Sequence, residues 1–321
     1  MKTFFWLVKR EFWEHKGGFV TAPLVAGAIG FLLNAMLIAF GEGHYAGANF
    51  HTNFSAAYDS ADLAKAGVVV DGLLYGVTLM ILIVTAIVVF FYCLGSLYDD
   101  RRDRSVLFWK SLPLSDTTTV LSKLASAVIF APAIAVVVGV VVGLALTIMF
   151  VGVASLHGLS AWPLLMQAHP FKVTLNLILL IPLYALWALP TAGWLMLCSA
   201  FARSKPFLWA IALPVGTGVL VSWWGLMIGD SGFSRWFWPN VVGRMLGGLI
   251  PAGWVNSTSR VVHSSDIDLA LHHGDPAAAM DQIGLAFHYS AVTNPSLYVG
   301  VLAGAAMIAG AIWFRRWRDD S

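Results

Sequence analysis

The chain has 321 residues, of which 59% are hydrophobic and only 11% carry a charged side chain. Soluble domains contain about 25% charged residues, so this composition excludes an ordinary soluble protein and indicates an integral membrane protein. The formal net charge of +2 and the two cysteines give no reason to expect a nucleic-acid partner, a disulfide framework or a cysteine-rich metal site.

The N-terminal residues predict a helix that lies in the membrane interface. The apolar side chains that share one face of a helix over residues 2–16 are Phe4, Phe5, Val8 and Phe12. Tryptophans flank this face and most basic side chains lie elsewhere, so we interpret residues 1–18 as an interfacial amphipathic helix. The apolar run that follows, from Phe19 to Phe40, is too long for the core of a signal peptide, and we expect an uncleaved first span.

Six apolar runs are long enough, or nearly so, to cross the membrane. A spanning helix needs about 20 apolar residues. The runs that meet this length cover residues 19–40, 68–95, 124–153, 173–201, 207–228 and 297–314. Four prolines fall inside these runs, where neighbouring helices can satisfy the freed backbone groups, so we expect kinks and not loops.

Lysine and arginine are distributed unequally between the two sides of the membrane. With the N-terminus inside, 14 of the 19 basic residues fall on the inner side and five on the outer side. The positive-inside rule therefore favours this orientation, and six spans return the C-terminus to the same side. We expect a single transmembrane domain over residues 19–321, with a cytoplasmic loop at 96–123 and a large extracytoplasmic segment at 229–296.

The polar stretch from Leu97 to Lys123 separates the second span from the third. Six consecutive charged residues, Asp99 to Arg104, precede the aromatic pair Phe108 and Trp109. Exposed aromatics beside charges are what a docking helix presents to the groove of a partner. On residue chemistry alone, an ordinary cytoplasmic loop with interfacial aromatics is an equal alternative. Pro113 ends the stretch, and Ser115 or Asp116 is placed to cap the next helix.

This stretch resembles the cytoplasmic loop of ABC-transporter permeases of the type-2 exporter family. That family shows an acid–Arg–acid run, a small residue, an apolar helix, a Ser-x-Pro-x-Ser break and a Lys at the start of the next span. The matching positions are Asp100-Arg101, Ser105, Val106 to Trp109, Ser111 to Ser115, and Lys123. Arg102 and Arg104 depart from the pattern, standing where an acid and a glycine are common.

The resemblance implies a fold and a set of partners. The fold is an all-α integral membrane protein with six transmembrane helices, both termini cytoplasmic, an N-terminal interfacial helix and a coupling helix between the second and third spans. The implied function is that of a permease subunit in the bacterial inner (cytoplasmic) membrane, working as a homodimer with a separate ATP-binding subunit. The chain has no Gly-x-x-x-x-Gly-Lys-Ser/Thr loop, so we expect ATP and Mg²⁺ to bind the partner and this chain to be neither an enzyme nor a cofactor protein.

The resemblance also implies which residues contact the ATP-binding subunit. These are Asp99, Asp100, Arg101, Arg102, Asp103, Arg104, Phe108, Trp109, Lys110, Leu112 and Pro113. The spans carry few ionisable residues, which argues against a self-powered ion-coupled carrier. Mildly polar, aromatic-rich walls suit an amphipathic or lipid-like small molecule or a peptide as the exported substrate, with membrane lipids around the domain.

Three other functions remain as alternatives. A permease-like sensor or scaffold that signals through its ATPase has the same sequence features. A membrane metal-handling protein is suggested only by a loop that holds imidazole and carboxylate side chains, namely His263, Asp266, Asp268, His272, His273 and Asp275. The spacing of these residues matches no ligand motif. An intramembrane enzyme is disfavoured because neither a His-Glu-x-x-His nor a Gly-x-Ser-x-Gly motif is present.

Overall fold

The computed structural model describes residues 2–40, 42–45, 48–51, 60–103, 115–156, 165–166, 168–229, 231–255 and 284–317. Six of its helices are long and apolar enough to cross a membrane, and they cover Gly17–Ile38, Gly67–Arg102, Asp116–Leu156, Pro170–Phe201, Pro206–Ile228 and Pro295–Trp317. The prediction of a helical, multi-pass membrane protein with six spans is therefore confirmed. The structure adds one short antiparallel hairpin, β1 (Glu42–Tyr45) with β2 (Ala48–His51), which the sequence did not predict.

The helices follow one another in the order expected from the apolar runs. They are α1 (Lys2–Glu14), η1 (Gly17–Thr21), α2 (Ala22–Phe40), α3 (Ser60–Gly95), α4 (Tyr98–Arg102), α6 (Asp116–Ala125), η2 (Ser126–Phe130), α7 (Ala131–Leu156), α9 (Pro170–Phe201), α10 (Pro206–Ile228), α11 (Gly232–Phe237), η3 (Trp238–Val242), α12 (Gly243–Gly247), α15 (Leu285–Tyr289), η5 (Ser290–Thr293) and α16 (Pro295–Trp317). Elements η1, η2 and η3 are π-helical turns, so α1 continues into α2, and α6 into α7, without a loop.

Local signals fix several helix ends. Ser115 is the N-cap of α6, where its Oγ accepts a hydrogen bond from the backbone N–H of Thr118 at 3.2 Å, as predicted. Prolines open α9 and α10, where a missing N–H costs no helical hydrogen bond. Pro182 and Pro190 lie inside α9 and Pro214 inside α10, and both helices continue through them.

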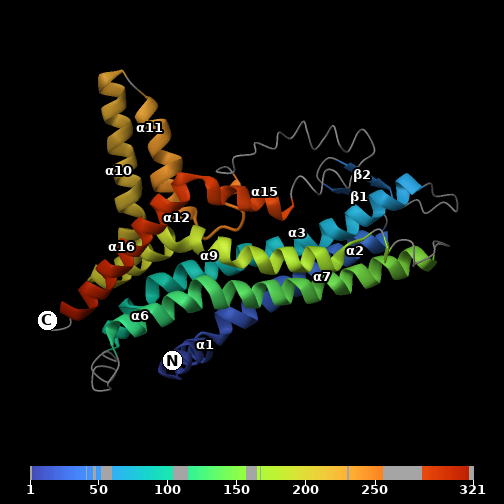
Figure 1. The fold of residues 1–321 in the computed structure, drawn as a ribbon, viewed down its shortest axis with the longest axis horizontal. Helices are drawn as coiled ribbons and strands as arrows, with labels where there is room; N and C mark the ends of the chain where they lie inside the picture. Colours follow the sequence, from blue (N-terminus) through green and yellow to red (C-terminus); the bar gives the residue numbers. More distant parts are fainter. Residues whose placement is uncertain are drawn as a thin grey trace.

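The long helices pack side by side into one bundle (Figure 1). Helix α16 lies along α9, α3 lies along α7, and α2 packs against both α3 and α7. A large apolar core joins α3, α6, η2, α9 and α16, and a second core joins α2, α3 and α7. Within the described residues, the N-terminal helix α1 contacts the bundle through α6 and η2. These contacts place the ends of α3, α6, α9 and α16 near one another.

Glycines permit the close approach of α9 and α16. A Cβ at Gly193 would lie 2.7 Å from the carbonyl oxygen of Gly304, and a Cβ at Gly304 would lie 2.8 Å from the backbone of Leu189. No side chain fits at that separation, because real Cβ contacts are longer. Small residues at a helix crossing are the usual means by which membrane helices bring their backbones together.

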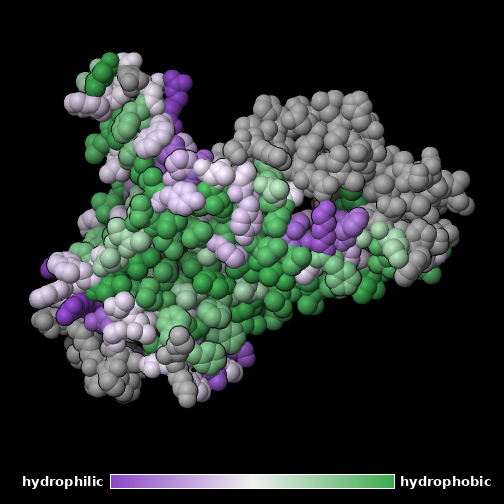
Figure 2. All heavy atoms as spheres, viewed as in Figure 1, coloured by the Kyte–Doolittle hydropathy of each residue, from purple (hydrophilic) through white to green (hydrophobic). Residues whose placement is uncertain are grey.

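Helices α10 and α11 project from the bundle as an arm (Figure 1). Leu220, Trp223 and Trp224 on α10 are each about two-thirds exposed, at 69%, 65% and 67%. Apolar side chains also cover much of the visible surface of the bundle, while polar ones form separate patches, some near its left-hand end and one toward the right (Figure 2). Such an apolar surface suits lipid or another protein chain and not water.

Candidate functional site

The polar stretch begins with α4, a five-residue helix directly after α3. Asp99, Asp100, Arg101 and Arg102 lie in α4 and Asp103 follows its last residue. The side chains of Asp99, Arg102 and Asp103 are exposed, whereas Asp100 and Arg101 are partly buried. The remaining predicted docking residues lie outside the described residues, and these are Arg104, Phe108, Trp109, Lys110, Leu112 and Pro113.

Arg101 attaches α4 to the end of α9. Its Nη2 donates to the carbonyl oxygen of Ser199 at 2.5 Å and to that of Ala202 at 3.0 Å. These carbonyls belong to the C-terminal end of α9, where backbone acceptors have no helical partner and a cation is favoured. Arg101 therefore acts as a side-chain cap for a helix about 100 residues away.

Ser199 strengthens the same contact from the other side. Its Oγ accepts hydrogen bonds from the backbone N–H groups of Leu97 at 3.0 Å and Tyr98 at 2.9 Å. These two groups open α4 and would otherwise lack an acceptor within that helix. Ser199 is fully buried, so the surrounding side chains fix the position of its hydroxyl and water does not compete for it. The start of α4 is thus fixed to α9 through both backbone and side chain.

Asp100 and Asp116 bind the C-terminal helix. Arg315 of α16 lies with its Nη1 3.2 Å from Asp100 Oδ2 and its Nε 3.1 Å from Asp116 Oδ1. The Arg315 side chain is only 5% exposed. One guanidinium therefore bridges α4, near the start of the polar stretch, and the first turn of α6, near its end.

A buried ion pair between Lys123 and Glu11 continues the network toward the N-terminus. Lys123 Nζ lies 3.1 Å from Glu11 Oε1 and 3.5 Å from Asp100 Oδ2. The side chains of Lys123 and Glu11 are 2% and 0% exposed. The hydroxyl of Tyr92 donates to Glu11 Oε2 at 2.9 Å, and Arg10 Nη2 lies 2.7 Å from Glu11 Oε1. We call Arg10, Glu11, Lys123, Asp100, Arg315 and Asp116 the polar network.

The polar network sets the charge state of Glu11. Burial disfavours the ionised carboxylate, but the positive charges of Lys123 and Arg10 and the hydrogen bonds from Tyr92 and Lys123 outweigh that effect. The pKa of the Glu11 carboxyl is therefore lowered from its ordinary value of 4.5. At neutral pH, Glu11 is a buried anion, and loss of its cationic partners would destabilise the fold.

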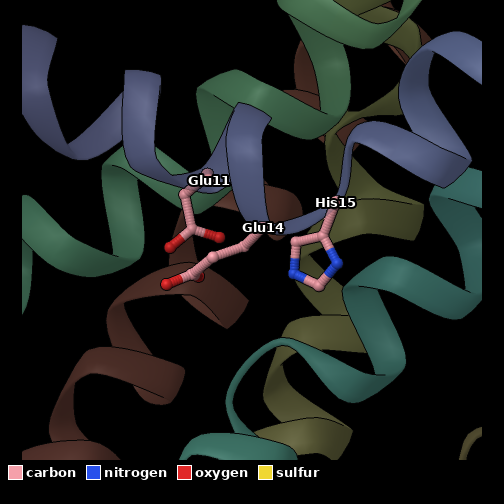
Figure 3. Close-up of side chains that lie close together, drawn as sticks. All are labelled: Glu11, Glu14 and His15. Carbon is pink, nitrogen blue, oxygen red and sulfur yellow. The ribbon is translucent and has the colours of Figure 1, made fainter.

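The side chains of Glu11, Glu14 and His15 lie close together at the end of α1 (Figure 3). One possible ligand atom of each residue lies within 4.8 Å of the others. Both carboxylate oxygens of Glu11 are already engaged with cations or with the Tyr92 hydroxyl. A metal ion there would face the repulsion of Lys123 and Arg10, so we assign the acids to the polar network and not to a metal site.

Further polar contacts, away from the polar network, hold α9 to α12 and α15 to the turn after α12. Thr191 Oγ1 donates to the carbonyl oxygen of Arg244 at 2.6 Å and accepts from the backbone N–H of Gly248 at 2.9 Å. Buried His288 accepts a hydrogen bond at Nδ1 from Trp254 Nε1 at 3.1 Å. The candidate metal loop, with His263, Asp266, Asp268, His272, His273 and Asp275, lies outside the described residues.

Sequence reasoning singled out Asp100, Arg101 and Lys123 but missed the residues that bind them. Glu11 and Ser199 were assigned no role, and neither was Tyr92, which binds Glu11, whereas Arg315 was only counted among the basic residues of the inner side. A signal was present in α1, because Glu11 shares a helical face with the buried side chains of Leu7 and Val8. A charged residue on a buried face needs a partner of opposite charge, although its identity cannot be read from one helix.

Comparisons with protein-family models, with curated proteins and with solved structures give no match to this chain.

Proposed function

We propose that this chain is the transmembrane permease subunit of an ATP-driven exporter of the ABC type, powered by a separate ATP-binding subunit. The observation that carries the proposal is the attachment of α4 to three other elements, one of which binds a fourth. Arg101 binds α9, Asp100 binds α16 and α6, and Lys123 extends the contacts to α1. A partner that pulled on the polar stretch would therefore move several helices at once.

The exposed side of α4 supplies the charges for such a partner. Asp99, Arg102 and Asp103 are exposed, while Asp100 and Arg101 are engaged within the chain. In this proposal the exposed charges set the register of docking, and the sequence-predicted pair Phe108 and Trp109 inserts into a cleft of the ATP-binding subunit. ATP and Mg²⁺ bind in that partner.

The proposal includes a second copy of the chain and a defined membrane. Both termini lie on the cytoplasmic side of a bacterial inner membrane, in keeping with the excess of basic residues on that side. The α10 arm, with its exposed Leu220 and Trp224, offers an apolar face for the second copy. The substrate is an amphipathic or lipid-like molecule or a peptide, moved outward.

The test is co-reconstitution with an ATP-binding subunit, to be sought in the reading frames next to that of this chain. We expect the permease to stimulate ATP hydrolysis, and inside-out vesicles to accumulate a fluorescent phospholipid or amphipathic peptide only when ATP and both subunits are present. Trp109→Asp should abolish stimulation while leaving the protein inserted and monodisperse. Trp317→Asp is the control, because it places the same substitution at an exposed tryptophan, 66% accessible, at the end of α16.

Each outcome bears on a different part of the proposal. ATP-dependent accumulation supports export. Stimulated hydrolysis without any transported substrate would favour a sensor that signals through its ATPase. Full stimulation by the Trp109→Asp protein would show that the aromatic pair is not the docking element.

A further inference from the structure

An apolar groove lies between α1 and the π-helical turn η2. Its volume is about 340 Å³. Phe5, Val8, Phe12 and Trp13 of α1 form one side, Phe130 of η2 forms part of the other, and Lys9 lies at its edge. Helix α1 is anchored beside this groove by the buried pair of Glu11 with Lys123, so the groove is a fixed feature of the fold.

The walls of the groove match a hydrocarbon chain. Phe5 is 64% exposed, Trp13 60% and Phe130 45%, so much aromatic surface remains uncovered by the protein itself. A lipid acyl chain is long, narrow and apolar, and burial of each of its methylenes strengthens binding about four-fold. The cavity is open along α1, the helix whose composition suits the interface between water and hydrocarbon.

Two lysines place positive charge beside the groove. Lys9 Nζ lies 4.8 Å from the ring centre of Trp6, and Lys16 Nζ lies 5.3 Å from that of Trp13. These four residues recur at positions i, i+3, i+7 and i+10 and so form one stripe along the helix. Tryptophan rings settle at the level of lipid headgroups, which puts both ammonium groups at the depth of the phosphates.

The acidic residues of α1 do not cancel this charge. Glu11 is buried against Lys123, and Glu14 Oε1 lies 3.2 Å from Arg10 Nε. Both carboxylates are thus paired with cations other than Lys9 and Lys16. The stripe therefore presents a net positive charge next to an apolar groove, which is the complement of an anionic phospholipid.

We propose that this groove is a binding site for an anionic phospholipid, with one acyl chain between α1 and η2 and the headgroup phosphate between Lys9 and Lys16. The site rests on the contacts of α1 and on no assumption about transport or an ATP-binding partner. It differs from the general lipid coat of a membrane protein because it selects headgroup charge at a defined place.

The test uses phosphatidylglycerol and phosphatidylcholine that each carry a photoreactive diazirine on the acyl chain. The purified chain is reconstituted in vesicles of unlabelled phosphatidylcholine containing a trace of either probe, irradiated and digested. We expect the phosphatidylglycerol probe to label peptides containing Phe5 to Trp13 and Ser126 to Phe130. The preference over the phosphatidylcholine probe should be about five-fold for each lysine that contacts the headgroup.

Two pairs of variants test separately what the groove walls and the lysine charges contribute to lipid binding. Phe5→Ala with Phe130→Ala removes groove walls, and its control is Phe171→Ala with Phe233→Ala, which alters two other exposed phenylalanines. Lys9→Gln with Lys16→Gln removes the charged stripe, and its control is Arg203→Gln with Lys205→Gln, two exposed cations at the end of α9. All four targets of the test variants are partly or fully exposed, so folding should be preserved.

The expected result is specific to each pair. The phenylalanine variant should lose labelling by both probes in these peptides, and the lysine variant should lose only the preference for phosphatidylglycerol. Equal labelling of the groove and of the exposed α10 arm by both probes would overturn the proposal. Absence of labelling of the groove peptides by either probe in the parent protein would show that no lipid chain occupies the groove and would overturn it as well.

Discussion

Lys123 and Glu11 lie 112 residues apart in the chain, yet the Lys123 ammonium is 3.1 Å from one carboxylate oxygen of Glu11 and 3.3 Å from the other. Both side chains are removed from solvent, and the hydroxyl of Tyr92 shares the same carboxylate. Charges at such a site are tolerated only as a pair, because each alone would carry a large desolvation cost. The pair therefore joins the N-terminal helix to the third span.

Removal of one partner should destabilise the protein strongly. Lys123→Met keeps the length of the side chain but removes the buried cation of Glu11 and leaves this anion with the partly exposed Arg10, and we expect a loss of about 3–5 kcal/mol in the free energy of unfolding. The measurement is thermal unfolding of the purified protein in one detergent. In the double variant Glu11→Gln with Lys123→Met, most of that loss should be recovered.

Glu14→Gln is the matched control for this prediction. The Glu14 side chain is 46% exposed, and its pairing with Arg10 is a surface contact. We expect a change within about 0.5 kcal/mol. Equal thermal stability of Lys123→Met and the parent protein would show that Arg10 alone compensates the charge of Glu11.

The stability of the protein should fall at acidic pH through Glu11. The pKa of its carboxyl is lower in the folded chain than the ordinary value of 4.5, because Lys123 and Arg10 outweigh the effect of burial. Ionised Glu11 therefore stabilises the fold above that ordinary value, and this contribution is lost as the pH falls through the folded-state pKa. Melting temperatures measured from about pH 7 down to about pH 3 should show the decline.

Glu11→Gln tests whether the Glu11 carboxyl is responsible for the loss of stability at acidic pH. The variant should be less stable at neutral pH and should lose less stability on acidification than the parent protein. A parallel decline of both proteins would show that Glu11 is not the source of the acid sensitivity.

Arg101 should control the rigidity of α4. Arg101→Ala removes the donors to the carbonyl oxygens of Ser199 and Ala202, each a charged hydrogen bond worth about 1.5–3 kcal/mol. Hydrogen–deuterium exchange should become faster in residues 97–103 and at the end of α9. Arg101→Lys should give an intermediate effect, since an ammonium cannot reproduce the guanidinium geometry.

Arg102→Ala provides the comparison on the same helix. Arg102 is exposed, so its removal should leave exchange in α4 unchanged. If exchange rises equally in both alanine variants, the helix is held by its own backbone and not by Arg101.

The crossing of α9 and α16 should be intolerant of any added side chain. Gly193→Ala places a methyl group against the carbonyl oxygen of Gly304, and separation of the helices should cost about 1–3 kcal/mol. Gly76→Ala, at a position of α3 with open space around it, should be neutral or stabilising by up to about 1 kcal/mol. Both effects are measured as shifts in thermal unfolding, and equal shifts would contradict the crossing geometry.

The six spans could be predicted because their signal is local. A run of about 20 apolar residues must be a helix wherever it crosses hydrocarbon, since only a helix satisfies its own backbone groups. The cap at Ser115 was likewise readable from residue type and position. The hairpin of β1 and β2 was not predicted, because β1 carries no alternation of apolar and polar side chains and the alternation in β2 covers only four residues.

The partners within the polar network could not be predicted from the sequence. The contact of Arg315 with Asp100 joins residues 215 positions apart, and it depends on α16 lying against α9 and α6. Charge counting assigned Arg315 to the cytoplasmic side but gave no information on what it contacts. Asp100 and Arg101 were predicted to bind an ATP-binding subunit, which remains a prediction, and the structure adds that both also bind helices of this chain.

The polar network has a consequence for the order in which the chain assembles during synthesis. Glu11 leaves the ribosome first, but Lys123 follows only with the third span and Arg315 only with the sixth. Until then each charge must stay in water or with another counter-ion, because an unpaired charge is costly in the membrane. Helix α1 can therefore reach its final position only after the third span has been made, and α4 only after the last span has been inserted.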